Sequence, residues 1–172
     1  MAITKIQSES LNLADTYDFT GTVTGAGGVN TPNFAARMAT SQSLLNGATT
    51  KMQFDTEFFD TDSAYDNSTN YRFTVPSGQA GKYFINAKIT FNDVASDDAA
   101  QIIRLYKNGS QVAIGVRRTV GPNGRDATVN VAQLLDLSVS DYIEIYGYTN
   151  AGNTTMGNDI TQSIFEGFKI IE

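Results

Sequence analysis

The stretch YRFTVPSGQAGKYFINAKITF, residues 71–91, contains two segments in which apolar and polar residues alternate. Such alternation is typical of β-strands, because successive side chains of a strand point to opposite faces of the sheet. The pattern predicts a β-hairpin with one buried face. The residues expected on that face are Tyr71, Phe73 and Val75 from the first segment and Tyr83, Ile85, Ala87, Ile89 and Phe91 from the second.

The corner between the two segments, residues 76–81, is rich in turn-forming residues. Pro76 is expected to end the first strand, since it has no backbone N–H to donate to a neighbouring strand. Gly78 and Gly81 allow the chain to turn without a Cβ clash. Each large side chain buried on the hairpin contributes roughly 1.5–3 kcal/mol before entropy. The hairpin is therefore interpreted as part of the core rather than as a reaction centre.

The chain from Pro32 onward repeats this pattern of short apolar strands and turns. The Asn108-Gly109 dipeptide is the strongest short hairpin signal, since both central positions of such a turn favour positive φ. Only residues 133–137, QLLDL, could also form a helical turn. The pattern predicts an all-β, ten-stranded sandwich or jelly roll. The expected strands are 34–38, 48–54, 58–60, 71–75, 82–91, 101–109, 111–118, 126–139, 141–149 and 164–171.

The composition excludes several classes of function. The 172 residues include no Cys and no His, and the net charge is −6. Disulfides, thiolate nucleophiles, zinc–thiolate sites and the commonest general base are therefore absent. An acidic chain without a basic stripe is not expected to bind nucleic acid, and no apolar run is long enough to enter a membrane. An enzyme would need two acids facing one cleft, and no such pair is evident, so the protein is not expected to be an enzyme.

Residues 1–32 differ from the rest of the chain and are predicted to be an extended arm with a Gly-rich linker, whereas residues 33–172 form the domain. The arm has too few large apolar residues for a core of its own. One interpretation is a disordered tail, and the other is an arm that docks on a partner by adding a strand. The apolar side chains that would dock are Leu11, Leu13, Phe19 and Val23.

Two groups of carboxylates are candidates for a cation site. The spacing of Asp60, Asp62 and Asp66 is similar to that of a calcium loop, but the Gly and the bidentate Glu of such a loop are missing. The second group consists of Asp93, Asp97 and Asp98, which are the candidate calcium ligands. The favoured interpretation is a solvated acidic loop, so no cofactor is expected.

Two other groups of residues could bind a ligand. Arg117, Arg118 and Arg125 lie around the Gly-Pro-Asn-Gly turn, where bidentate hydrogen bonds could hold an anionic glycan or the carboxylates of a partner. The alternative is that they only make the loop soluble. Tyrosines also line one face of the segment 141–149 together with Glu144, and such a stripe can bind sugar or pack against another surface. These tyrosines are Tyr142, Tyr146 and Tyr148.

Four segments in the same order and spacing resemble the globular head of complement C1q, which belongs to the tumour-necrosis-factor-like jelly rolls. The resemblance covers about residues 50–171, and its segments are 65–91, 103–113, 134–149 and 165–170. Its motifs are Y-x-F-T-V-P at Tyr71 to Pro76, G-x-Y at Gly81 to Tyr83, K-N-G at Lys107 to Gly109, and F-x-G-F at Phe165 to Phe168.

This resemblance implies a ten-stranded jelly roll that forms a homotrimer about a threefold axis, with aromatic residues near the seam. It favours packing at that seam, rather than sugar binding, for the tyrosine stripe. Some members of the family bind calcium through loop carboxylates. The sequence departs from the family in having Ser140-Asp141 where Gly-Asp is usual, so that turn is expected to be built differently. The given sequence also contains no collagen-like Gly-X-Y repeat.

The first segment, residues 3–25, resembles the attachment segments of bacteriophage fibres and virion appendages. This implies a structural protein on the virion surface, assembled in the reducing host cytoplasm and anchored to other virion proteins by its arm. A chain of 30 extended residues reaches about 100 Å, which favours a capsid decoration, knob or short head or tail appendage over a long fibre. It could aid particle stability or host adhesion through a host-surface glycan or receptor. The alternatives are a receptor-binding tip of a tail fibre and a free, soluble, lectin-like module.

Overall fold

The computed structural model describes residues 30–94, 99–118, 125–152, 154–157 and 161–171. The described residues form thirteen β-strands and no helix. The strands are β1 (Asn33–Arg37), β2 (Gln42–Leu44), β3 (Thr49–Lys51), β4 (Thr56–Asp60), β5 (Tyr65–Asp66), β6 (Arg72–Thr74), β7 (Gly81–Val94), β8 (Ala100–Lys107), β9 (Ser110–Arg118), β10 (Arg125–Leu137), β11 (Tyr142–Thr149), β12 (Thr154–Met156) and β13 (Ser163–Lys169).

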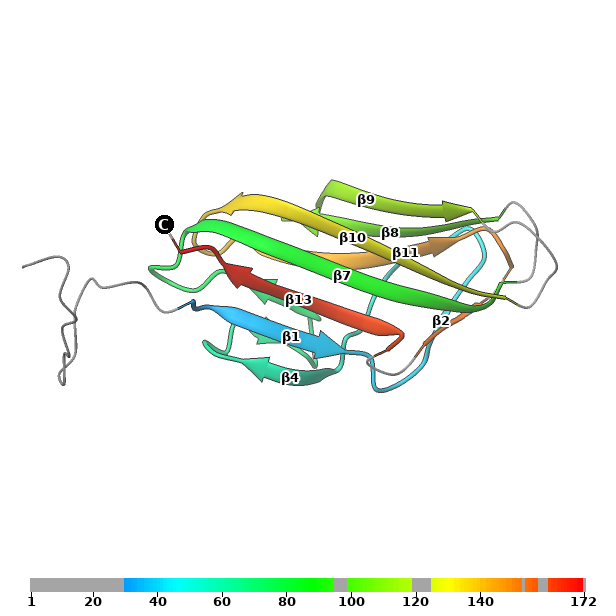
Figure 1. The fold of residues 1–172 in the computed structure, drawn as a ribbon, viewed down its shortest axis with the longest axis horizontal. Coiled ribbons are helices and arrows are strands. Elements are labelled where there is room, and N and C mark those ends of the chain that lie inside the picture. Colours follow the sequence, from blue (N-terminus) through cyan, green and yellow to red (C-terminus); the bar gives the residue numbers. More distant parts are fainter. Residues whose placement is uncertain (1–29, 95–98, 119–124, 153, 158–160, 172) are drawn as a thin grey trace, which may run out of the picture.

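The strands are arranged in two antiparallel sheets that pack face to face. Sheet A contains β4, β1, β13, β7 and β10 side by side. β12 pairs with the C-terminal end of β7, and β2 pairs with β12. Sheet B contains β5, β6, β11, β8 and β9, with β3 also paired to β11. Figure 1 shows the long strand β7 running through the molecule beside β13, with β8 and β9 in the other layer. The prediction of an all-β sandwich is confirmed.

All ten predicted strands are present, but the expected number of strands is wrong. The three additional strands, β2, β5 and β12, contain only two or three residues. Their sequences QSL, YD and TTM are too short for an apolar alternation to be recognised. Within the described residues, no helix is long and apolar enough to cross a membrane.

The two strands of residues 71–91 do not form the predicted hairpin. β6 belongs to sheet B, where it pairs with β5 and β11, whereas β7 belongs to sheet A. The corner between them crosses from one sheet to the other through a turn in which Gln79 N–H donates to Pro76 O, with Gly78 at φ +76°. Alternation predicts which side chains are buried, but it carries no information on which strand lies beside which.

The buried faces are predicted more accurately than the pairing. All five apolar residues expected on the inner face of β7 have no exposed surface, and Phe73 and Val75 are buried opposite them. The rings of Phe73 and Tyr83 lie 5.5 Å apart, and Phe73 also stacks on Phe34 at 4.8 Å. Tyr71 is an exception, since it precedes β6, is only partly buried and has a φ of +49°.

Two turns test the sequence predictions directly. Asn108 and Gly109 have φ values of +51° and +76° and join β8 to β9, as the Asn-Gly signal predicts. Ser140 also adopts a positive φ, of +70°. The turn before β11 thus has the backbone conformation that glycine favours, although the residue is serine. Ser140 N–H donates to Val75 O, which holds this turn against the end of β6.

The edge of the sandwich between β9 and β10 is closed by a close backbone approach. A Cβ atom at Gly115 would lie 2.1 Å from the carbonyl oxygen of Asn130. Two residues further along β9, Arg117 Nη1 donates to Thr128 O at 3.5 Å. Only a residue without a side chain allows the two strands to lie this close together.

Gly115→Ala is therefore expected to destabilise the domain by about 1–3 kcal/mol, because the obstructing atom belongs to the backbone and cannot rotate away. Urea unfolding followed by circular dichroism measures the effect. Gly147→Ala is the matched control, since its Cβ would meet the side-chain ends of Met52 and Leu44 at 3.0–3.2 Å, which can shift. A Gly115→Ala protein that is at least as stable as Gly147→Ala contradicts the close approach.

Candidate binding surfaces

The outer face of sheet B carries a group of aromatic and charged side chains. In β11, Ile143 and Ile145 face the core, and the alternate residues point outward. Residues directly opposite each other in an antiparallel pair share a face, so the cross-strand partners of these outward residues lie on the same surface. We call this surface the tyrosine–arginine face. Its residues are Lys51 of β3, Arg72 of β6, Arg104 and Tyr106 of β8, and Tyr142, Glu144, Tyr146 and Tyr148 of β11.

Rings and guanidinium groups interleave on this face. Tyr106 and Tyr146 have ring centroids 4.6 Å apart. The guanidinium carbon of Arg72 lies 4.3 Å from the ring centroid of Tyr142. Likewise, the guanidinium carbon of Arg104 lies 5.1 Å from the centroid of Tyr148. Stacking of this kind fixes the orientation of a guanidinium plane.

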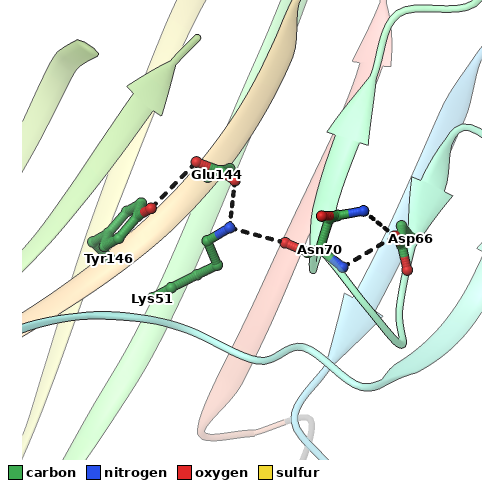
Figure 2. A network of polar contacts seen from close by, with 5 residues as sticks. All are labelled: Lys51, Asp66, Asn70, Glu144 and Tyr146. Atoms are coloured by element: carbon green, nitrogen blue, oxygen red, sulfur yellow. Dashed lines mark hydrogen bonds and ion pairs between the residues drawn. The ribbon is translucent and has the colours of Figure 1, made fainter. Parts of the chain in front are cut away.

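A polar network holds the middle of the face (Figure 2). Glu144 is only 5% exposed, and its carboxylate pairs with Lys51 Nζ at 2.5 Å and accepts a hydrogen bond from the Tyr146 hydroxyl at 3.3 Å. Lys51 also donates to the carbonyl oxygen of Asn70. Burial, followed by the nearby Glu144 carboxylate, raises the pKa of Tyr146, so its hydroxyl keeps its proton. The network joins β3, β11 and the loop before β6.

The two stacked arginines differ from the other charged groups of the face. Lys51 and Glu144 neutralise each other. By contrast, neither Arg72 nor Arg104 has a carboxylate within ion-pair distance in the described part of the chain. Arg104 donates one hydrogen bond, from Nη1 to the Thr49 hydroxyl at 2.8 Å. Two oriented guanidinium groups are thus available to an anion.

The predicted tyrosine stripe lies on this face, because Tyr142, Tyr146 and Tyr148 all point outward from β11. The sequence prediction missed Tyr106, Arg72 and Arg104. Each of these residues alternates with buried neighbours in its own strand, so each is expected to point outward. Only the register between β6, β11 and β8 shows that they lie on the same surface as the tyrosines.

A second surface lies on the outer face of sheet A. Phe168, Phe84 and Leu134 are cross-strand neighbours on β13, β7 and β10, and Phe59 lies beside them on β4. We call these four residues the aromatic patch. The exposed fractions are 52% for Phe59, 40% for Phe168 and 60% for Leu134. A hollow of about 390 Å³ between the three phenylalanines is also lined by Asn30, the first described residue.

The arginines singled out in the sequence have a different arrangement. Arg117 and Arg118 are exposed at the end of β9, and Arg117 is engaged with β10 through Thr128 O. Arg125 begins β10, but its side chain lies outside the described structure. The docking residues of the arm, Leu11, Leu13, Phe19 and Val23, also lie outside the described residues.

Two carboxylates of the first candidate group accept hydrogen bonds from backbone N–H groups in turns. Asp60 accepts a hydrogen bond from Tyr65 N–H, and Asp66 accepts from the backbone N–H groups of Ser68, Thr69 and Asn70. These backbone donors hold the pKa of Asp66 well below its usual range. Among the residues that the structure describes, no group of three acidic side chains could hold a metal ion. The side chain of Asp93, and the whole of Asp97 and Asp98, fall outside that part.

Solved structures with the same arrangement of strands are known, although the sequences have diverged. The globular domain of zebrafish complement 1qA protein superposes with a TM-score of 0.60 at 14% identity, covering 81% of this chain and 97% of that one. Murine APRIL at pH 5.0 superposes with a TM-score of 0.59 at 13% identity, covering 80% of this chain and 98% of that one. Eiger TNF from S. frugiperda superposes with a TM-score of 0.56 at 12% identity, covering 80% of this chain and 90% of that one. The domain therefore has a C1q- and TNF-like jelly-roll fold.

The sequence comparisons give no closer relative. No protein-family profile matches the chain, and no curated protein sequence matches it.

Proposed function

We propose that this chain is a structural protein of a bacteriophage virion, displayed on the particle surface as a homotrimer and anchored by residues 1–32. The aromatic patch carries the self-association part of the proposal. Monomeric proteins rarely leave clustered aromatic side chains in water, and a closed cyclic assembly covers such a patch with copies of the same chain. The similarity of the fold to C1q and TNF jelly rolls supports the threefold arrangement.

The virion part of the proposal is supported by the similarity of residues 3–25 to phage attachment segments and by the position at which the arm joins the domain. Asn30 lines the hollow of the aromatic patch. In a trimer that covers this patch, the three copies of residue 30 lie close to the threefold axis. Three arms can then bind one site on the particle, which raises the overall affinity through effective concentration.

The exposed jelly roll would serve particle stability or host adhesion, as a capsid decoration, knob or short appendage. The chain is not proposed to be an enzyme, a nucleic-acid-binding protein or a membrane protein. Proteomic analysis of purified particles tests the location on the virion. Detection of the chain in the particles is the expected result. A chain found only as a free trimer would instead support the soluble, lectin-like alternative.

Phe168→Asp is expected to convert the trimer to monomers, because it places three charges in an apolar seam. Sedimentation equilibrium at micromolar concentration and moderate salt measures the change. Ile114→Asp is the matched control, since Ile114 is 49% exposed on the opposite sheet and its replacement should leave a trimer. A monomeric unmodified protein, or equal dissociation of the two variants, would rule out the aromatic patch as the seam.

A further inference from the structure

The two arginines of the tyrosine–arginine face have no carboxylate partner in a chain rich in carboxylates. The sequence contains 18 acidic and 12 basic residues, yet Arg72 and Arg104 form no ion pair within the described residues. The acidic side chains near them are already engaged, Glu144 by Lys51 and Asp66 by backbone N–H groups. The face therefore leaves two positive charges for an external anion.

The orientation of these guanidinium groups suits a carboxylate. Each guanidinium lies over a tyrosine ring, so little rotamer freedom remains to be lost when a ligand binds. A planar guanidinium binds a carboxylate through two parallel N–H···O bonds.

The spacing of the two arginines indicates an extended ligand. Arg72 is opposite Glu144, and Arg104 is opposite Tyr146, on the two sides of β11. Two residues along a strand and two strand spacings across the sheet give a Cα separation of about 12 Å. The side chains lean further apart, because the guanidinium groups lie over Tyr142 and Tyr148, which are about 20 Å apart along β11. A single small carboxylate cannot reach both arginines, whereas a polymer with a carboxylate on successive units can.

The surface between and beside the arginines is suited to sugar rings. Tyr146 lies between the two guanidinium groups along β11, and Tyr106 packs against it from β8. The C–H face of a pyranose packs against an aromatic ring of this kind. Val112, Ile114 and Val116 form an exposed aliphatic row on the adjacent strand β9.

We propose that the tyrosine–arginine face binds an acidic polysaccharide, with carboxylates on Arg72 and Arg104 and sugar rings on the tyrosines between them. The inference deepens the host-adhesion part of the proposed function. In a trimer sealed through the aromatic patch on sheet A, the outer face of sheet B points away from the seam. The proposal therefore departs from the expectation that the tyrosine stripe packs at the seam. The site is formed within one chain, so it does not require the trimer.

Isothermal titration calorimetry with two carboxylated probes, oligogalacturonate and oligosialic acid, tests the proposal at moderate salt. At least one probe is expected to bind, and its methyl-esterified form, which has the same sugars without the charge, is expected to bind at least about tenfold more weakly. Absence of binding to both probes at millimolar concentration overturns the proposal. Equal or tighter binding of a single-stranded oligonucleotide of the same charge also overturns it.

Variants test the residues. Arg72→Gln and Arg104→Gln should each weaken binding about tenfold or more. Lys88→Gln is the matched control, because it removes the same charge from the outer face of sheet A and should leave the affinity unchanged. Arg104→Lys keeps the charge but loses the planar fork, so it should bind more weakly than the unmodified chain. Equal losses in Lys88→Gln and Arg104→Gln would show only a general charge effect and overturn the assignment.

The same calorimetric titration of the Phe168→Asp variant tests whether ligand binding depends on the proposed trimer. The monomer is expected to bind short oligosaccharides with the same affinity per site. Loss of binding in a folded monomer would mean that the ligand site lies between chains, which contradicts the proposal. Failure to find the chain in virions would not affect these titrations.

Discussion

Replacing Phe73 by Ala is expected to lower the free energy of unfolding by about 3–5 kcal/mol, because the removed ring leaves a cavity that the surroundings cannot fill. Phe73 has no exposed surface. Its ring comes from β6 of sheet B and lies between Phe34 and Tyr83, which belong to β1 and β7 of sheet A. It therefore joins the two sheets at the centre of the sandwich, where loss of packing affects both.

Urea unfolding, followed by far-ultraviolet circular dichroism at a fixed protein concentration, measures this loss. The concentration must be fixed because dissociation of a trimer is coupled to unfolding. Ile114→Ala is the control, since that side chain is about half exposed and its removal should change stability by less than about 0.5 kcal/mol. A Phe73→Ala protein as stable as the control would mean that the ring is not in the core and that the register of β6 is wrong.

The strands and their buried faces were predictable because both depend on local alternation. Pairing was not predictable in the same way. Residues 71–75 and 82–91 look like a hairpin, but the corner at Pro76 sends β6 and β7 into different sheets. The separation is stabilised by contacts with residues distant in sequence, such as Val75 N–H donating to Asp141 O. No pattern within residues 71–91 contains that information.

In the candidate site, too, features within one strand were predictable and features that depend on strand pairing were not. The stripe Tyr142, Tyr146 and Tyr148 is visible in one strand, whereas Arg72 and Arg104 join it only through the register of three strands. The acidic group Asp60, Asp62 and Asp66 shows a different ambiguity. A spacing similar to that of a calcium loop also suits carboxylates that accept backbone N–H groups in tight turns, as Asp66 does here. Spacing alone does not distinguish the two uses.

Deleting residues 1–30 is expected to abolish incorporation into particles and to leave a folded, trimeric jelly roll. The sheets and the core cluster of the described domain begin at β1 and Phe34, beyond the deleted segment. The residues proposed to dock are Leu11, Leu13, Phe19 and Val23. Burying four such side chains supplies several kcal/mol per chain at roughly 1.5–3 kcal/mol each, and three arms on one trimer multiply that affinity.

Co-sedimentation with particles that lack the native copy measures incorporation, and sedimentation equilibrium of the same sample confirms the trimer. A full-length variant with Ser at all four docking positions should be lost from the particles in the same way. This variant distinguishes the contribution of the apolar side chains from that of the length of the arm. Its matched control replaces the polar neighbours Asn12 and Thr20 by Ser and should still be incorporated. If truncated trimers decorate the particles at full occupancy, the attachment surface must lie on the jelly roll. The aromatic patch would then have to act in docking instead of, or together with, trimer formation.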